Sequence, residues 1–132
     1  MQILERFEQR GLRIVGLKLL SVSEAQAREH YGEHEGKFFF DGLVEHLQSG
    51  PVIGAVLEGP EVITIVRAMV GSTRPHEATP GTIRGDFAVA GLRNLVHASD
   101  APETAAKEIG YWFGAEELTE YGRGLDAWIF EA

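Results

Sequence analysis

Four arginines lie shortly before His97 in the chain, and together they could hold a polyphosphate. The window from residue 67 to residue 97 contains them with only two acids, although the whole chain has a formal net charge of −8. The arginines are Arg67, Arg74, Arg84 and Arg93, and the acids are Glu77 and Asp86. Guanidinium groups match phosphate oxygens, and a neutral imidazole has a lone pair that can attack phosphorus. The window therefore predicts a phosphate site with His97 as the phosphoryl acceptor.

The composition excludes several other functions. The chain has 132 residues, 44% of them hydrophobic and 24% charged, which is typical of one folded domain. The acidic balance argues against nucleic acid and membrane surfaces as partners, because both attract a basic face. There is no cysteine, so disulfides, thiolate metal sites and thiol nucleophiles are excluded. No apolar run approaches the ~18 residues of a membrane span, and no signal peptide is recognisable, so we expect a cytoplasmic protein.

Four segments have the composition of β-strands. Residues 12–20 and 51–57 are rich in apolar and β-branched side chains, and residues 95–97 and 127–130 are shorter segments of the same kind. Helical patterns separate them, so the sequence predicts an α+β fold with helices over a small sheet. The order of the strands does not follow from the sequence.

Helix signals fill most of the remaining chain. We expect helices near residues 1–10, 23–31, 41–49, 60–70 and 100–113. Ser23 with Gln26, and Asp100 with Glu103, have the spacing of capping boxes that open helices. Residues 72–94 show no clear period, and so long a connection in a compact domain is usually functional.

Several motifs occur in the order and spacing of one enzyme family. They are TIRGDF, RNLVHASD, AAKEIGYWF, EHYGEHEGKFFFDGLVEHLQSGPV and the closing AWIFE. In these motifs the chain resembles the nucleoside diphosphate kinases over nearly its whole length, as one domain over residues 1–132. The resemblance implies a ferredoxin-like βαββαβ core, a four-stranded antiparallel sheet and extra helices. The family opens with a strand ending in Lys-Pro-Asp, and this chain begins after it. We therefore expect the first, central strand and its lysine to be missing.

The resemblance implies the catalytic residues. His97 matches the histidine that accepts the phosphoryl group, and Glu108 matches the carboxylate that holds its other ring nitrogen. Tyr31 and Ser99 match positions beside that histidine. Taken alone, a histidine after an apolar pair is more often structural than catalytic. Tyr31 and Ser99 would also suit a packed aromatic ring and a hydroxyl at the start of a helix.

The resemblance also implies the phosphate and ribose contacts. Arg67, Thr73 and Arg84 match the phosphate clamp, in which two guanidinium groups and a hydroxyl oppose the charge of the transferred group. Asn94 matches the residue that hydrogen-bonds the ribose hydroxyls. Without the family, Arg67 would suit a surface ion pair equally well.

The base is expected to stack on Phe39, with Leu43 beneath it. Stacking with few contacts to the base edge gives weak base selectivity, because every base has a π-face. The family's apolar residue over the other face of the base falls on Gly91, so that contact would have to come from Leu92.

The sequence thus predicts ping-pong transfer of the γ-phosphate of a nucleoside triphosphate to a nucleoside diphosphate, with Mg²⁺ carried on the nucleotide. The resemblance implies a homo-oligomer, a hexamer or tetramer, with residues 72–80 in the contact. One alternative is a truncated, inactive or regulatory nucleotide-binding homologue, and another is a histidine-phosphorylated signalling module. His30 and His34 have the i, i+4 spacing of metal ligands, but Gly32 separates them and both read as exposed. No protein metal site is therefore predicted.

Overall fold

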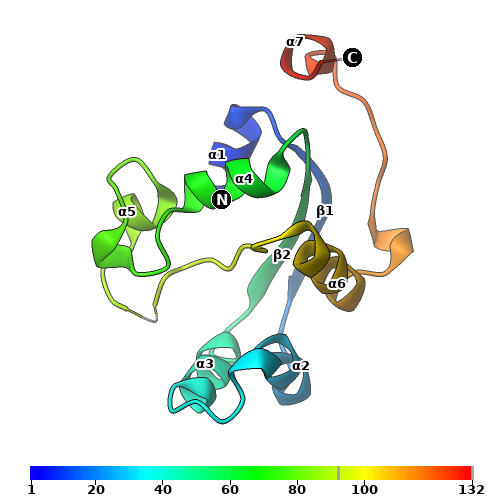
Figure 1. Ribbon diagram of the computed structural model, residues 1–132. Helices are drawn as coiled ribbons and strands as arrows, with labels where there is room; N and C mark the ends of the chain where they lie inside the picture. Colours follow the sequence, from blue (N-terminus) through cyan, green and yellow to red (C-terminus); the bar gives the residue numbers. More distant parts are fainter. Residues whose placement is uncertain (92, 132) are drawn as a thin grey trace.

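Two antiparallel strands form the sheet in the part of the chain that the structure describes. The computed structural model describes residues 1–91 and 93–131. Strand β1 (Arg13–Leu20) pairs with β2 (Val52–Glu58), with one register shift between Ile14 and Gly16 (Figure 1). The sequence predicts both strands to within one residue at each end, and the expected α+β class is confirmed.

The helices surround this two-stranded sheet. They are α1 (Gln2–Arg10), α2 (Glu24–His30), α3 (Phe40–Leu47), α4 (Val62–Val70), α5 (Ile83–Phe87), α6 (Pro102–Trp112) and α7 (Asp126–Ile129), with 3-10 turns at Gly32–His34, Pro75–Glu77 and Ala115–Glu117. None of the described helices has the length and hydrophobicity needed to cross a membrane.

One predicted capping box is present and the other is not. Ser23 Oγ accepts from Gln26 N at 3.1 Å, and Gln26 Oε1 accepts from Ser23 N at 2.9 Å, which confirms the start of α2. The box at Asp100 is wrong, because α6 begins at Pro102 and has no side-chain cap. Proline at the first helical position has its φ preset and no N–H to satisfy, so α6 can begin there without a cap.

Residues 95–97, predicted as a strand, form none. In the described residues the sheet contains only β1 and β2, so no neighbouring strand is available to residues 95–97. A segment becomes a strand only with a partner that completes its ladder of hydrogen bonds. The four-stranded sheet that the resemblance implies is therefore reduced to two strands.

The prediction of a strand over residues 127–130 is wrong, because α7 occupies this segment. A strand needs a partner and a buried face, yet Trp128 is 87% exposed. The backbone instead forms local hydrogen bonds, with Phe130 N donating to Asp126 O at 2.8 Å.

Helix α5 lies inside the stretch that shows no period in the sequence. Thr82 Oγ1 accepts from Gly85 N at 3.0 Å and donates to Thr79 O at 2.6 Å, so this threonine caps the helix. The helix has five residues, too few to display a period. Nevertheless it buries Ile83 and Arg84, which are 0% and 3% exposed.

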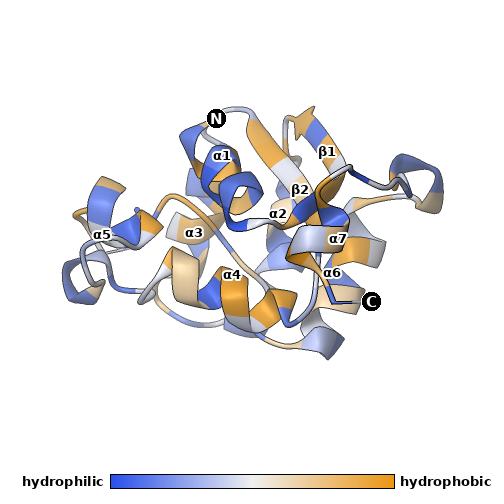
Figure 2. Cartoon of the chain, turned by 90° about the horizontal axis from the view of Figure 1, so that it is seen from above, coloured by the Kyte–Doolittle hydropathy of each residue, from blue (hydrophilic) through white to orange (hydrophobic). Residues whose placement is uncertain are grey.

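Two hydrophobic clusters form the core, and the segment carrying His97 connects them. The first contains Phe7, Leu12, Val70, Ile83 and Ala98. The second contains Val22, Ala27, Phe40 and Val44, with Trp112 of α6 packed against it. Figure 2 shows apolar residues concentrated on α4 and the strands. Because Val96 and Ala98, on either side of His97, pack in the first cluster and Trp112 packs on the second, packing at both ends fixes the segment from residue 96 to residue 112.

Ion pairs fasten the C-terminal segment to the start of β1. Asp126 Oδ2 lies 2.7 Å from Arg13 Nη2, and Asp126 Oδ1 lies 2.7 Å from Arg123 Nε. Arg123 Nη2 also donates to Gly11 O at 2.7 Å. The backbone N–H of Arg123, followed by the side chains of Arg13 and Arg123, lowers the pKa of Asp126 to about 2.

We expect Asp126→Asn to lower the melting temperature at neutral pH. The pKa of Asp126 in the folded chain lies below the ordinary value of 3.8, so its stabilisation is complete above about pH 4. That stabilisation is lost as the pH falls through about 2, and the difference between variant and wild type should then disappear. Thermal unfolding followed by circular dichroism at several pH values measures this, with the exposed Asp100→Asn as control. A difference that does not change with pH would contradict the assignment.

Candidate active site

His97 lies beside a carboxylate and presents its opposite edge outward. Its side chain is 49% exposed, and its Nε2 lies 2.6 Å from Glu108 Oε2. Glu108 projects from α6, and its other oxygen accepts a hydrogen bond from Ser99 Oγ at 2.7 Å. A carboxylate only accepts, so the imidazole proton lies on Nε2 and the lone pair on Nδ1. No hydrogen-bond partner of Nδ1 occurs among the described residues, so this nitrogen can act as a nucleophile.

Arg84 braces the segment that carries His97. Its Nε donates to Asn94 O at 3.1 Å, its Nη1 to Gly71 O at 3.2 Å and its Nη2 to Val96 O. Burial, followed by the charge of Arg67, lowers the pKa of Arg84. The guanidinium group is thus held by three backbone carbonyls rather than by acidic side chains.

The backbone between two of these carbonyls is in an unusual conformation. Leu95 has φ of 71°, in the left-handed region that residues other than glycine rarely adopt. Arg84 donates hydrogen bonds to the carbonyls of Asn94 and Val96, the residues before and after Leu95. The buried guanidinium group therefore holds Leu95 in this conformation, and it also fixes the backbone that leads into His97.

Arg67 contacts the same segment from α4. Its Nη1 donates to Ala98 O at 3.0 Å, and the side chain is partly exposed. Both predicted arginines of the phosphate clamp therefore lie beside the His97 segment. Thr73, the third predicted member, is exposed, and its backbone carbonyl accepts from Asn94 Nδ2 at 3.1 Å.

A row of rings leads from His97 to the predicted base site. The ring of His30 lies 4.6 Å from that of His97 and 4.7 Å from that of Tyr31. Beyond Tyr31, the ring of His34 lies 5.4 Å from that of Phe39. Leu43 follows one helical turn after Phe39, with its N–H donating to Phe39 O at 3.1 Å. The prediction for Leu92 lies outside the described residues.

The expectation from the sequence that His30 is an exposed polar residue is wrong. Its side chain is only 7% exposed, and its Nδ1 accepts from Trp112 Nε1 at 3.2 Å. Burial, followed by the charge of His97, lowers the pKa of His30 to about 4, so this histidine is neutral at pH 7. A buried indole N–H requires an acceptor, so Trp112 was the one indication in the sequence that a polar side chain is buried beside it. The sequence does not indicate that this side chain is His30.

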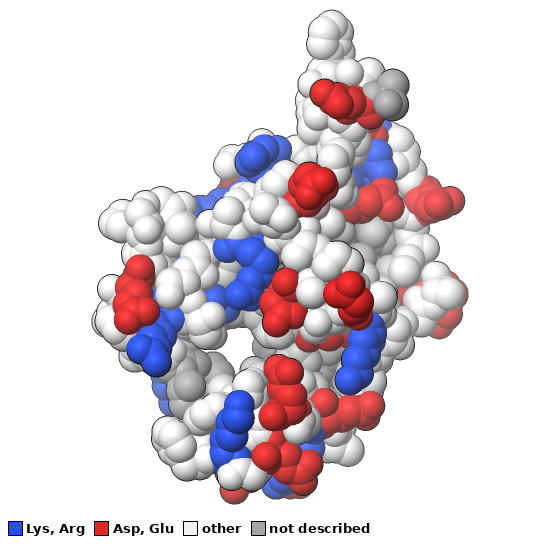
Figure 3. Space-filling model, in the orientation of Figure 1, with Lys and Arg blue, Asp and Glu red and all other residues white. Residues whose placement is uncertain are grey.

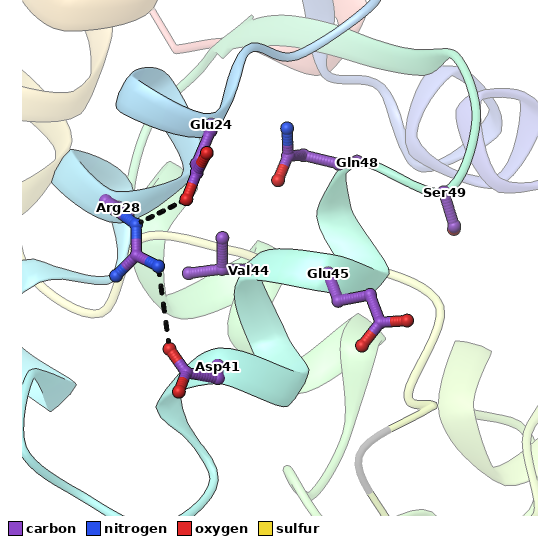
Figure 4. Close-up of a pocket in the computed structure, with 7 residues that line it drawn as sticks. All are labelled: Glu24, Arg28, Asp41, Val44, Glu45, Gln48 and Ser49. Carbon is purple, nitrogen blue, oxygen red and sulfur yellow. Dashed lines mark hydrogen bonds and ion pairs between the residues drawn. The ribbon is translucent and has the colours of Figure 1, made fainter.

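A separate hollow between α2 and α3 does not suit a phosphate. It has a volume of about 480 Å³ and is lined by Glu24, Arg28, Asp41, Val44, Glu45, Gln48 and Ser49 (Figure 4). Its one arginine pairs with Glu24 at 3.0 Å and with Asp41 at 3.7 Å. Three carboxylates, with one arginine that is already paired with two of them, would repel an anion.

On the face of the molecule seen in Figure 3, Lys, Arg, Asp and Glu side chains all lie around an opening.

Taken together, these residues define a site of the phosphoryl-transfer class. A carboxylate holds Nε2 of His97, Nδ1 has no hydrogen-bond partner among the described residues, and two guanidinium groups contact the backbone carbonyls on either side of this histidine. A model of the family "Nucleoside diphosphate kinase" matches residues 1–118. A nucleoside diphosphate kinase of Roseiflexus castenholzii is 57% identical over 129 residues, covering 98% of this chain and 87% of the relative. One from Desulforamulus reducens is 52% identical over 130 residues, with the same coverage.

Solved structures of nucleoside diphosphate kinases are similar to this chain as well. The halophilic nucleoside diphosphate kinase from Halobacterium salinarum, in complex with CDP, superposes with a TM-score of 0.96 at 42% identity. A family protein from Babesia bovis does so with a TM-score of 0.93 at 43% identity. Each comparison covers 98% of this chain and 87% of the other. The chain belongs to the nucleoside diphosphate kinase family. Its activity is that of a phosphotransferase, which moves the γ-phosphate of a nucleoside triphosphate to a nucleoside diphosphate.

Proposed function

We propose that this transfer proceeds through a phosphohistidine on His97. In the first half-reaction, the Nδ1 lone pair attacks the γ-phosphorus of a nucleoside triphosphate. A P–N bond forms, the bond from phosphorus to the β,γ-bridging oxygen breaks, and the diphosphate leaves with that oxygen. In the second half-reaction, a terminal β-phosphate oxygen of another diphosphate attacks the same phosphorus and releases the imidazole. The observation that carries the proposal is the 2.6 Å contact of His97 Nε2 with Glu108.

Glu108 supports the ring as it gains charge. When Nδ1 bonds to phosphorus, positive charge develops on the imidazole, and a carboxylate at Nε2 stabilises it. Ser99 orients that carboxylate through its 2.7 Å hydrogen bond. The pair therefore acts on the transition state rather than on nucleotide binding.

We expect Glu108→Gln to slow phosphorylation of the protein about 100-fold, the usual scale for a positioned acid–base partner. Glutamine retains the shape and one acceptor but lacks the negative charge. Rapid-quench measurement of phosphoprotein formation from labelled ATP gives the rate. The exposed Glu103→Gln on the same helix is the matched control and should match wild type. Equal rates for the two variants would remove Glu108 from the mechanism.

The phosphates would be held by Arg67, Thr73 and Arg84. Arg67 is only partly buried and already lies beside the backbone after His97, so its guanidinium group can reach a phosphate near Nδ1. Arg84 contributes its buried positive charge while bracing the segment. Burial raises the pKa of Tyr31, so its hydroxyl stays protonated and can donate to a phosphate oxygen.

The nucleoside would lie along the row of rings. Phe39 is partly exposed and can stack on a base, with Leu43 beneath it, while Asn94 binds the ribose. Mg²⁺ would enter on the nucleotide, because its preferred oxygen ligands are supplied by the phosphates.

We further propose a homo-oligomer, a hexamer or tetramer, acting in the cytoplasm, where nucleoside di- and triphosphates are available. In support of self-association, Leu17, Leu19 and Ile53 of the sheet are 51%, 71% and 45% exposed. Exposed apolar patches of this kind commonly mark protein contacts.

A single-turnover experiment tests the proposed mechanism. ATP mixed with excess protein, without diphosphate, should release ADP and leave one acid-labile phosphoryl group per chain that reacts. A nucleoside diphosphate added next should remove the label as triphosphate. Nucleotide binding with no phosphoprotein would instead support a regulatory nucleotide-binding role, and label passed only to another protein would support a signalling role.

A further inference from the structure

Two imidazoles and a carboxylate converge behind the nucleophilic nitrogen. One ligand atom from each of His30, His97 and Glu108 lies within 4.8 Å of the others. The two histidine rings are nearly perpendicular, at 83°. Glu108 Oε2 lies 2.6 Å from His97 Nε2 and 3.7 Å from His30 Nδ1. This carboxylate oxygen thus faces a nitrogen of each ring.

We propose that this cluster binds a divalent transition-metal ion such as Zn²⁺, and that the bound ion stops phosphoryl transfer. The second part rests on the proposed role of His97, whereas the binding itself does not.

The ligand set selects the class of metal. Zn²⁺ binds imidazole nitrogen and carboxylate oxygen at about 2.0–2.2 Å, which in a tetrahedron separates ligand atoms by roughly 3.3 Å. The two distances from Glu108 Oε2, 2.6 Å and 3.7 Å, lie on either side of that value, and all three ligand atoms lie within 4.8 Å of one another. Rotation of the exposed His97 side chain would bring the two imidazole nitrogens to the separation that the ion requires. Imidazole favours zinc, copper and nickel, whereas Mg²⁺ prefers oxygen. The nucleotide's Mg²⁺ would therefore not compete for this site, and water could complete the coordination on the exposed side of His97.

His30 is available as a ligand because Nδ1 carries a lone pair, as its hydrogen bond shows. An indole N–H only donates, and Nδ1 accepts from Trp112 Nε1 at 3.2 Å. A metal ion would take this lone pair and break the hydrogen bond to the indole. Trp112 is therefore a built-in optical reporter of binding.

The bound ion would disable the nucleophile by changing the tautomer of His97. It takes the lone pair of Nε2, so the ring proton moves from Nε2 to Nδ1, and Nδ1 no longer has a lone pair with which to attack phosphorus. The ion also takes Glu108 as its own ligand, so the ring loses its supporting carboxylate. The metal-bound protein should consequently accept the phosphoryl group slowly.

Tryptophan fluorescence and Co²⁺ absorption test binding independently of activity. The chain has two tryptophans, and Trp128 is 87% exposed, so Trp128→Phe leaves Trp112 as the only reporter. In this background, Zn²⁺ should change the emission and saturate at one ion per chain, and Co²⁺ should give a tetrahedral visible spectrum. His30→Ala should weaken binding at least about 10-fold. It should raise by the same factor the Zn²⁺ concentration that halves the rate of phosphoprotein formation. His46→Ala, at an exposed histidine of α3, is the control and should change neither quantity.

Equal Zn²⁺ binding by the His30→Ala and His46→Ala proteins would overturn the proposal, as would saturable binding being absent from the wild type. If circular dichroism shows that His30→Ala does not fold, Glu108→Gln takes its place, because it removes the anionic ligand and retains the shape. A Co²⁺ spectrum without phosphoprotein would leave the metal site standing and refute the proposed role of His97. Phosphoprotein that forms without metal binding would refute the metal site alone.

Discussion

Replacing His97 with alanine is expected to lower phosphoprotein formation and nucleotide turnover by at least about 1,000-fold, as loss of a covalent nucleophile does in other enzymes. Alanine removes Nδ1, and none of the other described residues holds a nitrogen at that place. The side chain is 49% exposed, so its loss should leave the fold intact. Labelling with γ-labelled ATP and a coupled assay of nucleoside triphosphate formation measure the two rates.

A matched variant separates this effect from general damage. His46 is an exposed histidine on α3, so His46→Ala should label and turn over as the wild type does. Labelling of His97→Ala at the wild-type rate would place the acceptor elsewhere in the chain.

The second large effect is expected at Arg84, where both stability and activity should fall. Arg84→Met keeps most of the volume but leaves the carbonyls of Gly71, Asn94 and Val96 without their donor. A buried acceptor left unsatisfied costs about 1–3 kcal/mol, and these three carbonyls belong to half-buried residues, so we expect a loss at the lower end, about 3 kcal/mol in total, in the free energy of unfolding. Phosphoprotein formation should slow as well, because Leu95 is no longer held at positive φ and His97 moves with it.

Urea unfolding of Arg84→Met and Arg84→Lys distinguishes a brace from a simple phosphate ligand. Lysine keeps the positive charge but cannot reach three carbonyls at once, so Arg84→Lys should also be destabilised. Arg74→Met, at an exposed arginine before α5, is the control and should unfold like wild type. If Arg84→Lys raised only the KM for nucleotide and left unfolding unchanged, the bracing role would be wrong.

The sequence predicts what depends on local pattern. Strands β1 and β2 follow from apolar and β-branched runs, and the start of α2 follows from the spacing of Ser23 and Gln26. These features are set by neighbours in the chain. The contact of His97 with Glu108, which the structure places at 2.6 Å, was implied only by the resemblance to the family, because Glu108 taken alone reads as an ordinary helix acid.

Features that depend on distant partners are not predictable in this way. The tip of α5 buries Arg84 because three carbonyls from two other segments surround it, and no local pattern encodes them. His30 is buried because Trp112, far along the chain, donates to it. Residues 95–97 have strand composition without a ladder partner in the described chain, so their composition alone misleads.

Locating the phosphoryl group tests the phosphohistidine mechanism most directly. The phosphoprotein, formed from ATP and digested under alkaline conditions, can be examined by mass spectrometry for the site and by ³¹P NMR for the bonded nitrogen. We expect one phosphoryl group on Nδ1 of His97, because Glu108 occupies Nε2. A phosphoryl group on Nε2 of His97, or on any other residue, would contradict this expectation.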